Sequence, residues 1–268
     1  MKKNIICALA ILASSLLADE ANLLKNGDFS MGPVNWITTG EIVEENGAGA
    51  LVLKGQNVRA ISRQPIPVEA GANYRFSAIV SADKPVNQVL IGLIPLDAKN
   101  RQIVFRNAEG ALFNTETTLA EPFEKGTDTL VLAENAIWQE TWNKKLAHNV
   151  AFNVKADKSD LPNFDLMQIK SITTENGKTT VKLTRPTKVA YPAGTALRIH
   201  KDGATFIYTS IIRKGFPGEV TEAGTVGPNE KLKFRPGTVS MQAFLLLIPA
   251  KAAPDVTVKI RDVKIVKF

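Results

Sequence analysis

The stretch that decides the fold is N-L-L-K-N-G-D-F-S-M-G-P-V-N-W, which runs from Asn22 to Trp36. It combines an Asn-Gly turn and a Gly-Pro loop with two large aromatic side chains, Phe29 and Trp36. Asn-Gly and Gly-Pro pairs mark tight turns, and aromatic residues of this size are usually buried. We therefore expect the first strand and first loop of a β-rich domain here, with Phe29 filling its core and Trp36 closing it.

The residues before this stretch have the pattern of an export signal. Lys2 and Lys3 precede a mostly apolar run from Ile5 to Leu17, and Ala18 provides a small residue at a plausible cleavage point. We interpret residues 1–18 as a signal peptide. The expected location of the mature protein is therefore secreted or periplasmic.

Cysteine content and hydropathy exclude several features from the chain that follows the signal. Cys7 is the only cysteine and lies within the signal, so the mature chain has no disulfide and no thiolate metal site. No later run approaches the roughly 20 apolar residues of a membrane helix. We therefore expect no transmembrane segment in the mature chain.

The charge pattern argues against nucleic acid as a partner. The formal net charge of the full chain is +7, and removing Lys2 and Lys3 leaves +5 (7 − 2). The basic residues are scattered singly and often alternate with apolar ones, as in V-K-I-R-D-V-K-I-V-K-F at the C-terminus. A nucleic-acid-binding surface would need a clustered basic patch, so this pattern predicts strands with one solvated face.

Strand patterns dominate the rest of the chain, and helical periodicity is weak. Apolar alternation or short apolar runs bounded by turn residues predict strands at 74–81, 88–96, 178–184, 239–249 and 256–268. E-N-G-K, which contains Asn176-Gly177, is a hairpin signal. The best helical candidate is short, at 135–145. Many short strands with frequent turns predict an all-β sandwich or barrel.

The middle of the chain differs in composition. Residues 115–208 are richer in Thr, Lys, Asp and Asn, and they hold both histidines and two of the three tryptophans. We interpret this region as a small β-rich unit inserted at a loop of the larger domain, because surface loops tolerate insertions.

Four segments resemble a known family in the order in which they occur. They are the opening stretch, I-P-V-E-A-G-A-N-Y-R-F-S-A at 66–78, V-L-I-G-L-I-P-L-D-A-K-N-R-Q-I at 89–103, and V-T-V-K-I-R-D-V-K-I at 256–265. Together they resemble carbohydrate-binding modules of the family 4, 9, 16 and 22 type, which are galactose-binding-like jelly rolls. The middle also resembles an insertion seen in secreted modules of this kind. The resemblance implies a jelly-roll β-sandwich built from 19–115 and 207–268 and interrupted by 116–206.

The same resemblance implies a sugar site and a structural calcium ion. The sugar would lie on the concave sheet or at the loop ends, and calcium would lie near the paired terminal strands. Asp262 matches the acidic residue of the closing strand, and Asp28 is a second candidate ligand. Calcium needs several oxygen ligands, and Ser30 stands where the family commonly has a Glu. This departure weakens the expectation of calcium.

Polar residues in apolar strand contexts are candidates for the sugar face. Arg59, Gln88 and Gln242 are unusual for plain core strands, and Asn57 precedes Arg59 in the same segment. Such side chains can satisfy sugar hydroxyls. The alternative is ordinary outward alternation on a solvated face, which period-2 patterning predicts equally well.

Trp138 and Trp142 are a second candidate. They are four residues apart, so on a helix they would share one face and could form an exposed stacking platform. The alternative is that they pack the insertion, since most large aromatic side chains are buried.

Three functions follow as hypotheses from these patterns. Non-catalytic binding of a polysaccharide or glycoconjugate is the first, and a structural or adhesion role in the cell envelope without sugar affinity is the second. A polysaccharide-degrading enzyme is the third and least supported, because no nucleophile elbow and no HExxH zinc motif occurs. We therefore expect a protein that is not an enzyme, with a glycan as its partner.

Overall fold

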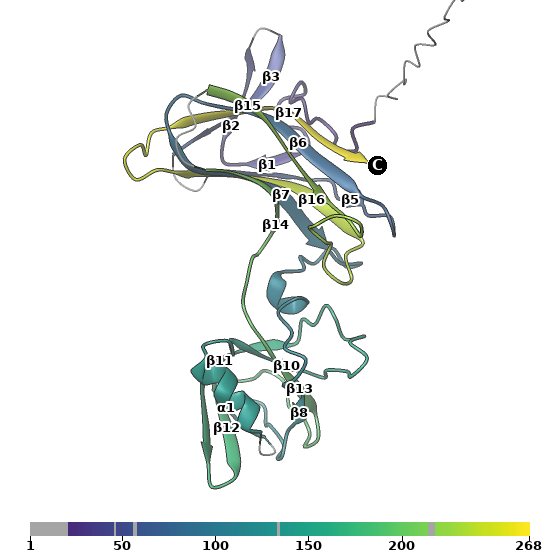
Figure 1. Ribbon diagram of the computed structural model, residues 1–268, viewed down its shortest axis with the longest axis vertical. Coiled ribbons are helices and arrows are strands. Elements are labelled where there is room, and N and C mark those ends of the chain that lie inside the picture. Colours follow the sequence, from purple (N-terminus) through teal and green to yellow (C-terminus); the bar gives the residue numbers. More distant parts are fainter. Residues whose placement is uncertain (1–20, 46, 56–57, 133–134, 214–217) are drawn as a thin grey trace, which may run out of the picture.

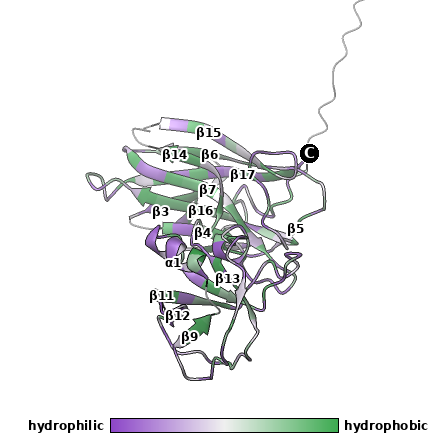
Figure 2. Cartoon of the chain, turned by 60° about the horizontal axis from the view of Figure 1, so that its bottom comes forward, coloured by the Kyte–Doolittle hydropathy of each residue, from purple (hydrophilic) through white to green (hydrophobic). Residues whose placement is uncertain are grey.

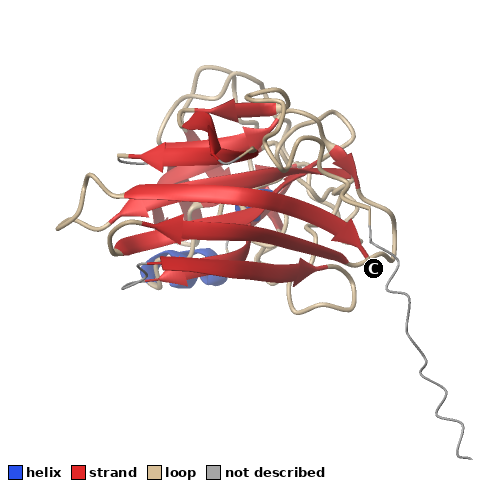
Figure 3. Ribbon diagram, turned by 90° about the horizontal axis from the view of Figure 1, so that it is seen from above, coloured by secondary structure: helices blue, strands red, loops and turns tan. Residues whose placement is uncertain are grey.

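A computed structural model describes residues 21–268 apart from 46, 56–57, 133–134 and 214–217. Two antiparallel sheets face each other as a sandwich, and a third sheet forms a separate unit below them in Figure 1. In the view from above, the strands of the five-stranded sheet lie in front and the helical segment lies behind them (Figure 3). The all-β class and the sandwich with a β-rich insertion, both predicted from the sequence, are confirmed. No helix among the described residues is long and apolar enough to cross a membrane.

The first sheet of the sandwich has six strands in the order β1-β4-β16-β7-β14, with β5 pairing at one end of β16. Its strands are β1 (Trp36–Thr38), β4 (Val58–Ser62), β5 (Ile66–Pro67), β7 (Val86–Leu96), β14 (Ile207–Arg213) and β16 (Ser240–Pro249). Every pairing in this sheet is antiparallel.

The second sheet has five strands in the order β15-β6-β17-β3-β2. Its strands are β2 (Glu41–Glu45), β3 (Ala48–Lys54), β6 (Tyr74–Ala82), β15 (Gly218–Val226) and β17 (Thr257–Lys267). Alternate residues of the central strands point into the sandwich, as in the buried Phe76, Ala78 and Val80 of β6. Figure 2 shows that β7, inside the first sheet, is more hydrophobic than β15, at the edge of the second sheet.

The third sheet is a nearly closed six-stranded barrel in the order β8-β13-β10-β11-β12-β9. Its strands are β8 (Thr117–Thr118), β9 (Thr129–Leu132), β10 (Asn149–Phe152), β11 (Leu166–Glu175), β12 (Lys178–Leu183) and β13 (Ala196–His200). A bridge between Leu119 and Leu132 brings the two edges together, and helix α1 (Ala136–Asn143) packs against the hydrophobic core of this unit. All of these elements fall within the segment 116–206.

The opening stretch folds as turns rather than as a strand, since β1 begins only at Trp36. Phe29 and Trp36 are both 1% exposed, with ring centroids 5.2 Å apart. The Trp36 indole N–H donates to the Asn26 carbonyl (2.9 Å), and Leu23 donates to Ile265 of β17 (2.8 Å). The expected first strand is therefore wrong, whereas the core roles of Phe29 and Trp36 are confirmed.

Two connecting segments join the sandwich to the third sheet, one after β7 and one before β14. The Arg235 side chain is 3% exposed and donates to the carbonyls of Ile103, Ala204 and Thr205 at 2.6 to 2.9 Å. One guanidinium group thus holds both connecting segments at the edge of the sandwich.

Candidate ligand-binding site

The residues predicted for the sandwich face do not form one site. Arg59 lies opposite Leu246 of β16, whereas Gln242 lies opposite Ile94 of β7. Four residues along β16 separate these two positions, which is about 13 Å in a strand. Gln88 lies opposite Ile248, near the Arg59 end. Asn57 lies outside the described residues.

The space between Arg59 and Gln242 is apolar and partly covered. Phe244 is 1% exposed, and the Phe206 ring stacks on it with centroids 3.8 Å apart. The Gln242 amide donates to the carbonyls of Ser62 (2.7 Å) and Arg63 (3.1 Å). Gln242 therefore stabilises the end of β4, and this explains a polar residue in an apolar strand.

The expected stacking platform on α1 is wrong for Trp138. Its side chain is 0% exposed, and its indole N–H donates to the Thr115 carbonyl (2.7 Å). Trp142 is half-buried and packs against the same core. It also lines a smaller cleft of about 390 Å³ with Lys145 and His148. The spacing of four residues brings Trp138 and Trp142 to one side of the helix, and that side packs on the hydrophobic core of the barrel.

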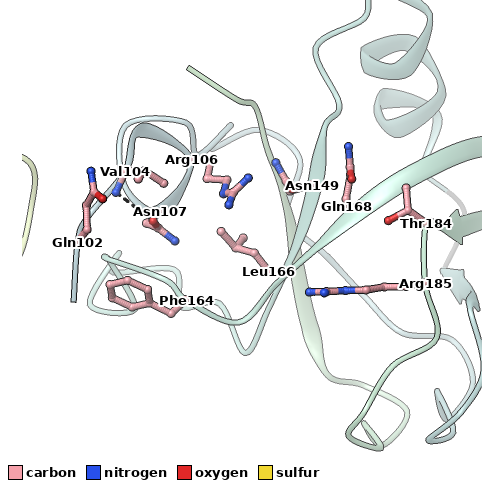
Figure 4. A pocket seen from close by; sticks show the side chains of 10 residues that line it. All are labelled: Gln102, Val104, Arg106, Asn107, Asn149, Phe164, Leu166, Gln168, Thr184 and Arg185. Carbon is pink, nitrogen blue, oxygen red and sulfur yellow. Dashed lines mark hydrogen bonds between the residues drawn. The ribbon is translucent and has the colours of Figure 1, made fainter. Parts of the chain in front are cut away.

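A larger cleft of about 560 Å³ lies on the outer face of the third sheet (Figure 4). Its floor comes from strand pairing: Gln168 of β11 lies opposite Asn149 of β10, and Asn149 lies opposite His200 of β13. Paired residues share a face, with Cβ atoms about 5 Å apart. The lining residues come from four separate segments of the chain: Gln102, Val104, Arg106, Asn107, Asn149, Phe164, Leu166, Gln168, Thr184 and Arg185.

One wall of the cleft is the connecting segment that contains the short 3-10 helix η1 (Phe105–Asn107). The Asn107 side chain donates to the Asn163 carbonyl (2.9 Å), and the Asn163 backbone N–H donates to the Asn107 carbonyl (2.7 Å). Asn163 also donates to the carbonyl of Phe152 in β10 (3.0 Å). Buried amides thus fix this wall to the sheet.

Two buried charged residues lie beside the floor. Arg198 of β13 is 0% exposed and donates to the Asp160 carboxylate (2.6 Å). Burial acts to raise the pKa of Asp160, but hydrogen bonds from Asn163 and Lys155 and the Arg198 charge lower it below its usual value. The pair is therefore ionised and buried, an arrangement that is stable only when both partners are present.

His200 continues this network to the cleft wall. The Arg198 Nε–H donates to His200 Nε2 (3.1 Å), so the proton of the imidazole is on Nδ1, which donates to the Arg106 carbonyl (2.6 Å). Burial lowers the pKa of His200 to about 4, and the nearby Arg198 charge acts in the same direction. A neutral His200 thus fixes the backbone of Arg106.

The polar groups around the cleft differ in how they are satisfied. Asn149 donates to the Asp202 carboxylate (3.0 Å), and the Arg106 guanidinium lies 3.6 Å from the same oxygen, beyond hydrogen-bonding distance. Among the described residues, the side chains of Gln168 and Arg185 have no hydrogen bond or ion pair, and both are exposed. The side-chain N–H donors of Gln168 and Arg185 are therefore available to a ligand in the cleft.

The predicted calcium ligands have other partners. The Asp28 carboxylate accepts hydrogen bonds from the backbone and hydroxyl of Ser30 (3.2 and 3.0 Å), and the Asp262 carboxylate lies 3.2 Å from the Lys264 ammonium. Within the described ranges, no group of three or more His, Cys, Asp or Glu residues could hold a metal ion. Calcium takes several oxygen ligands, including backbone carbonyls, and these two carboxylates alone do not provide that set, so calcium binding stays a prediction and no calcium-dependent step follows.

Sequence reasoning missed Arg106, Gln168 and Arg185. Gln168 carries the one available signal, since Met167 and Ile169 beside it are buried and alternation directs Gln168 outward. Nothing in the sequence indicates that residues 102–107 and 184–185 meet this strand.

Comparison of the sequence with models of protein families finds no match, and comparison with curated proteins finds none. Among solved structures, the chain is similar to TmCBM61 in complex with β-1,4-galactotriose (11% identity, TM-score 0.32, 92% of this chain and 99% of that chain). It is also similar to the metal-free carbohydrate recognition domain of Emp46p (10%, 0.35, 92% and 94%).

A third similar structure is the enzymatically active domain of bacteriophage CBA120 tailspike protein 4 (10% identity, TM-score 0.33). That match covers 92% of this chain but only 21% of the tailspike chain. Because the TM-scores of all three structures are below 0.5, these likenesses do not identify a ligand.

Proposed function

We propose that this protein is exported and binds a glycan, without altering it chemically, in the cleft on the outer face of the third sheet. The observation that carries the proposal is the lining of about 560 Å³. Two exposed guanidinium groups, the side-chain amides of Gln102 and Gln168, a Thr hydroxyl and the Phe164 ring, one face of which the Arg101 guanidinium covers, border the space, and the amides of Asn107 and Asn149 are buried beneath it. Planar amides and guanidinium groups satisfy sugar hydroxyls, and an aromatic ring supports the apolar face of a sugar.

The same lining supports binding rather than catalysis. Of the ten described residues that line the cleft, none is Asp, Glu, His, Cys or Lys. Glycoside hydrolysis uses two carboxyl groups on opposite sides of the scissile bond. The buried Asp160 does not line the cleft, and its carboxylate is engaged by Arg198.

Affinity electrophoresis with soluble polysaccharides tests this proposal. The gels would contain xylan, β-1,4-galactan, hydroxyethylcellulose, polygalacturonate or alginate. We expect at least one of these to retard the mature protein, and we expect Gln168→Ala to reduce the retardation because this exposed amide lies in the floor. Gln64→Ala is the matched control, since Gln64 is an exposed glutamine between β4 and β5 of the sandwich. If no gel retards the protein, the result contradicts glycan binding and favours the structural or adhesion role.

A further inference from the structure

We infer that the glycan bound in this cleft is acidic and that a sugar carboxylate is held between Arg106 and Arg185. This inference rests on the proposed function and specifies the class of glycan. Figure 4 shows the two guanidinium groups entering the cleft from opposite sides, one from the connecting segment and one from the segment after β12. A guanidinium group presents N–H donors in a planar fork that matches a carboxylate.

Arg106 is held in place for this contact. Its carbonyl accepts the hydrogen bond from His200, whose own orientation is fixed by the buried Arg198. Its side chain is 51% exposed, and its nearest carboxylate, Asp202, already accepts a hydrogen bond from Asn149. The backbone of Arg106 is therefore fixed, and its guanidinium, which forms an ion pair with Asp202 through Nη1 (3.6 Å), has further N–H donors that can bind a second carboxylate.

Arg185 is positioned in a different way. The backbone N–H of the preceding Thr184 donates to the Gln168 carbonyl (3.0 Å), which ties this segment to β11. The following residue is Pro186, and a residue before proline is restricted to extended backbone conformations. The described residues provide no carboxylate partner for the Arg185 guanidinium, so a ligand carboxylate would meet no competing ion pair there.

The groups between the two arginines indicate a sugar acid rather than a simple anion. The exposed Gln168 amide lies on the floor near Arg185, with the buried Asn149 beside it, and Phe164 lies at the opposite end of the cleft from Arg185 (Figure 4). An amide both donates to and accepts from hydroxyl groups, so Gln168 beside Arg185 suits a ligand that carries hydroxyls next to a carboxylate. A hexuronic acid combines these hydroxyls with one carboxylate on a ring.

Isothermal titration with polygalacturonate and with its methyl ester tests this inference, because esterification removes the charge and keeps the polymer. We expect one of two acids, polygalacturonate or alginate, to bind, with an affinity that falls as salt is added. For polygalacturonate, we expect the ester to bind at least about tenfold more weakly, as expected for loss of a charge-assisted contact.

Variants of Arg185 sharpen the test, since an exposed residue can be replaced without unfolding the chain. We expect Arg185→Gln to weaken acid binding about tenfold or more and Arg185→Lys to restore only part of it, since lysine lacks the fork. Lys54→Gln at the end of β3 removes one positive charge from the sandwich and should leave the affinity unchanged. The thermal midpoint of each variant verifies its folding.

Three results would overturn the inference and are distinguishable from one another. Equal binding of polygalacturonate and its ester, unaffected by Arg185→Gln, leaves glycan binding intact and rejects the carboxylate contact. Binding of neither acid, while xylan or β-1,4-galactan still retards the protein, shows a neutral-glycan site. Loss of every glycan signal rejects the proposed function as well.

Discussion

Two sheet faces in this molecule are covered by connecting chain in opposite ways. On the sandwich, the outer face of β16 and β7 is apolar, and Phe206 stacks directly on Phe244. On the third sheet, the outer face of β10 and β13 carries Asn149, Arg198 and His200, all buried. An apolar face is covered by close packing, whereas a polar face needs hydrogen-bonding partners at fixed positions.

This difference accounts for the polar cleft on the outer face of the inserted unit. The segment over the polar face is held by individual hydrogen bonds, such as those of Asn107 and His200, and does not fill the surface continuously. Space of about 560 Å³ remains beside these contacts. The polar residues thus fold the insertion and shape its cleft, while the sandwich depends on its apolar core.

The largest expected effect on stability comes from removing the buried ion pair on the outer face of the third sheet. Arg198→Met leaves the Asp160 carboxylate buried without its partner, and we expect a loss of about 3–5 kcal/mol in the free energy of unfolding. Urea unfolding measured by the fluorescence of Trp138 and Trp142, in a Trp36→Phe background, reports on the inserted unit. Adding Asp160→Asn should recover part of the loss. Arg59→Met on the sandwich is the control and should change stability by less than about 0.5 kcal/mol.

A second effect concerns pH. Unfolded histidine ionises near pH 6.5, whereas the pKa of folded His200 is about 4, so the unfolded chain takes up a proton in between. The contribution of neutral His200 is present in full above about pH 6.5 and is lost as the pH falls towards 4, on the order of 3 kcal/mol.

Unfolding free energies of wild type and His200→Gln between pH 7 and 4 measure this effect. The difference between the two proteins should shrink as the pH falls. The matched variant His148→Gln alters the other histidine, which directly precedes β10 and is half-buried, and should keep the wild-type pH dependence. A His200→Gln curve parallel to the wild type would contradict the assigned role of the neutral imidazole.

The smallest expected effect concerns the sandwich face. Gln242→Ala removes the amide that donates to Ser62 and Arg63, and we expect a loss of about 1 kcal/mol in stability. Glycan binding should be unchanged, because Gln242 does not line the cleft. Loss of affinity in a normally folded Gln242→Ala protein would show that the glycan binds on the sandwich face and not in the cleft.

Much of the fold was predictable from local patterns. The predicted strand at 74–81 is β6 (Tyr74–Ala82), and the predicted helix at 135–145 contains α1 (Ala136–Asn143). The Asn176-Gly177 hairpin joins β11 to β12, with positive φ values of 49° and 75° at these two residues. Alternation, turn residues and helix caps act within a few residues, so the sequence displays them directly.

The candidate site was not predictable in the same way. Trp138 was a reasonable ligand candidate by spacing, yet the fold buries it against Thr115. Gln242 looked like a sugar contact, yet its partners are the backbone carbonyls of a strand far away in sequence. Whether a polar side chain faces a ligand or another part of the chain depends on contacts between distant segments.

The sequence by itself determined the all-β class, the positions of β6, β7, β12, β16 and β17 and the core roles of Phe29 and Trp36, because these follow from local periodicity and side-chain size. Only the tertiary structure decided where the cleft lies. Arg106, Gln168 and Arg185 come from three segments, and strand register together with the buried Arg198–His200 contacts brings them to one surface. Register depends on pairing across the whole unit, and no short stretch of sequence contains it.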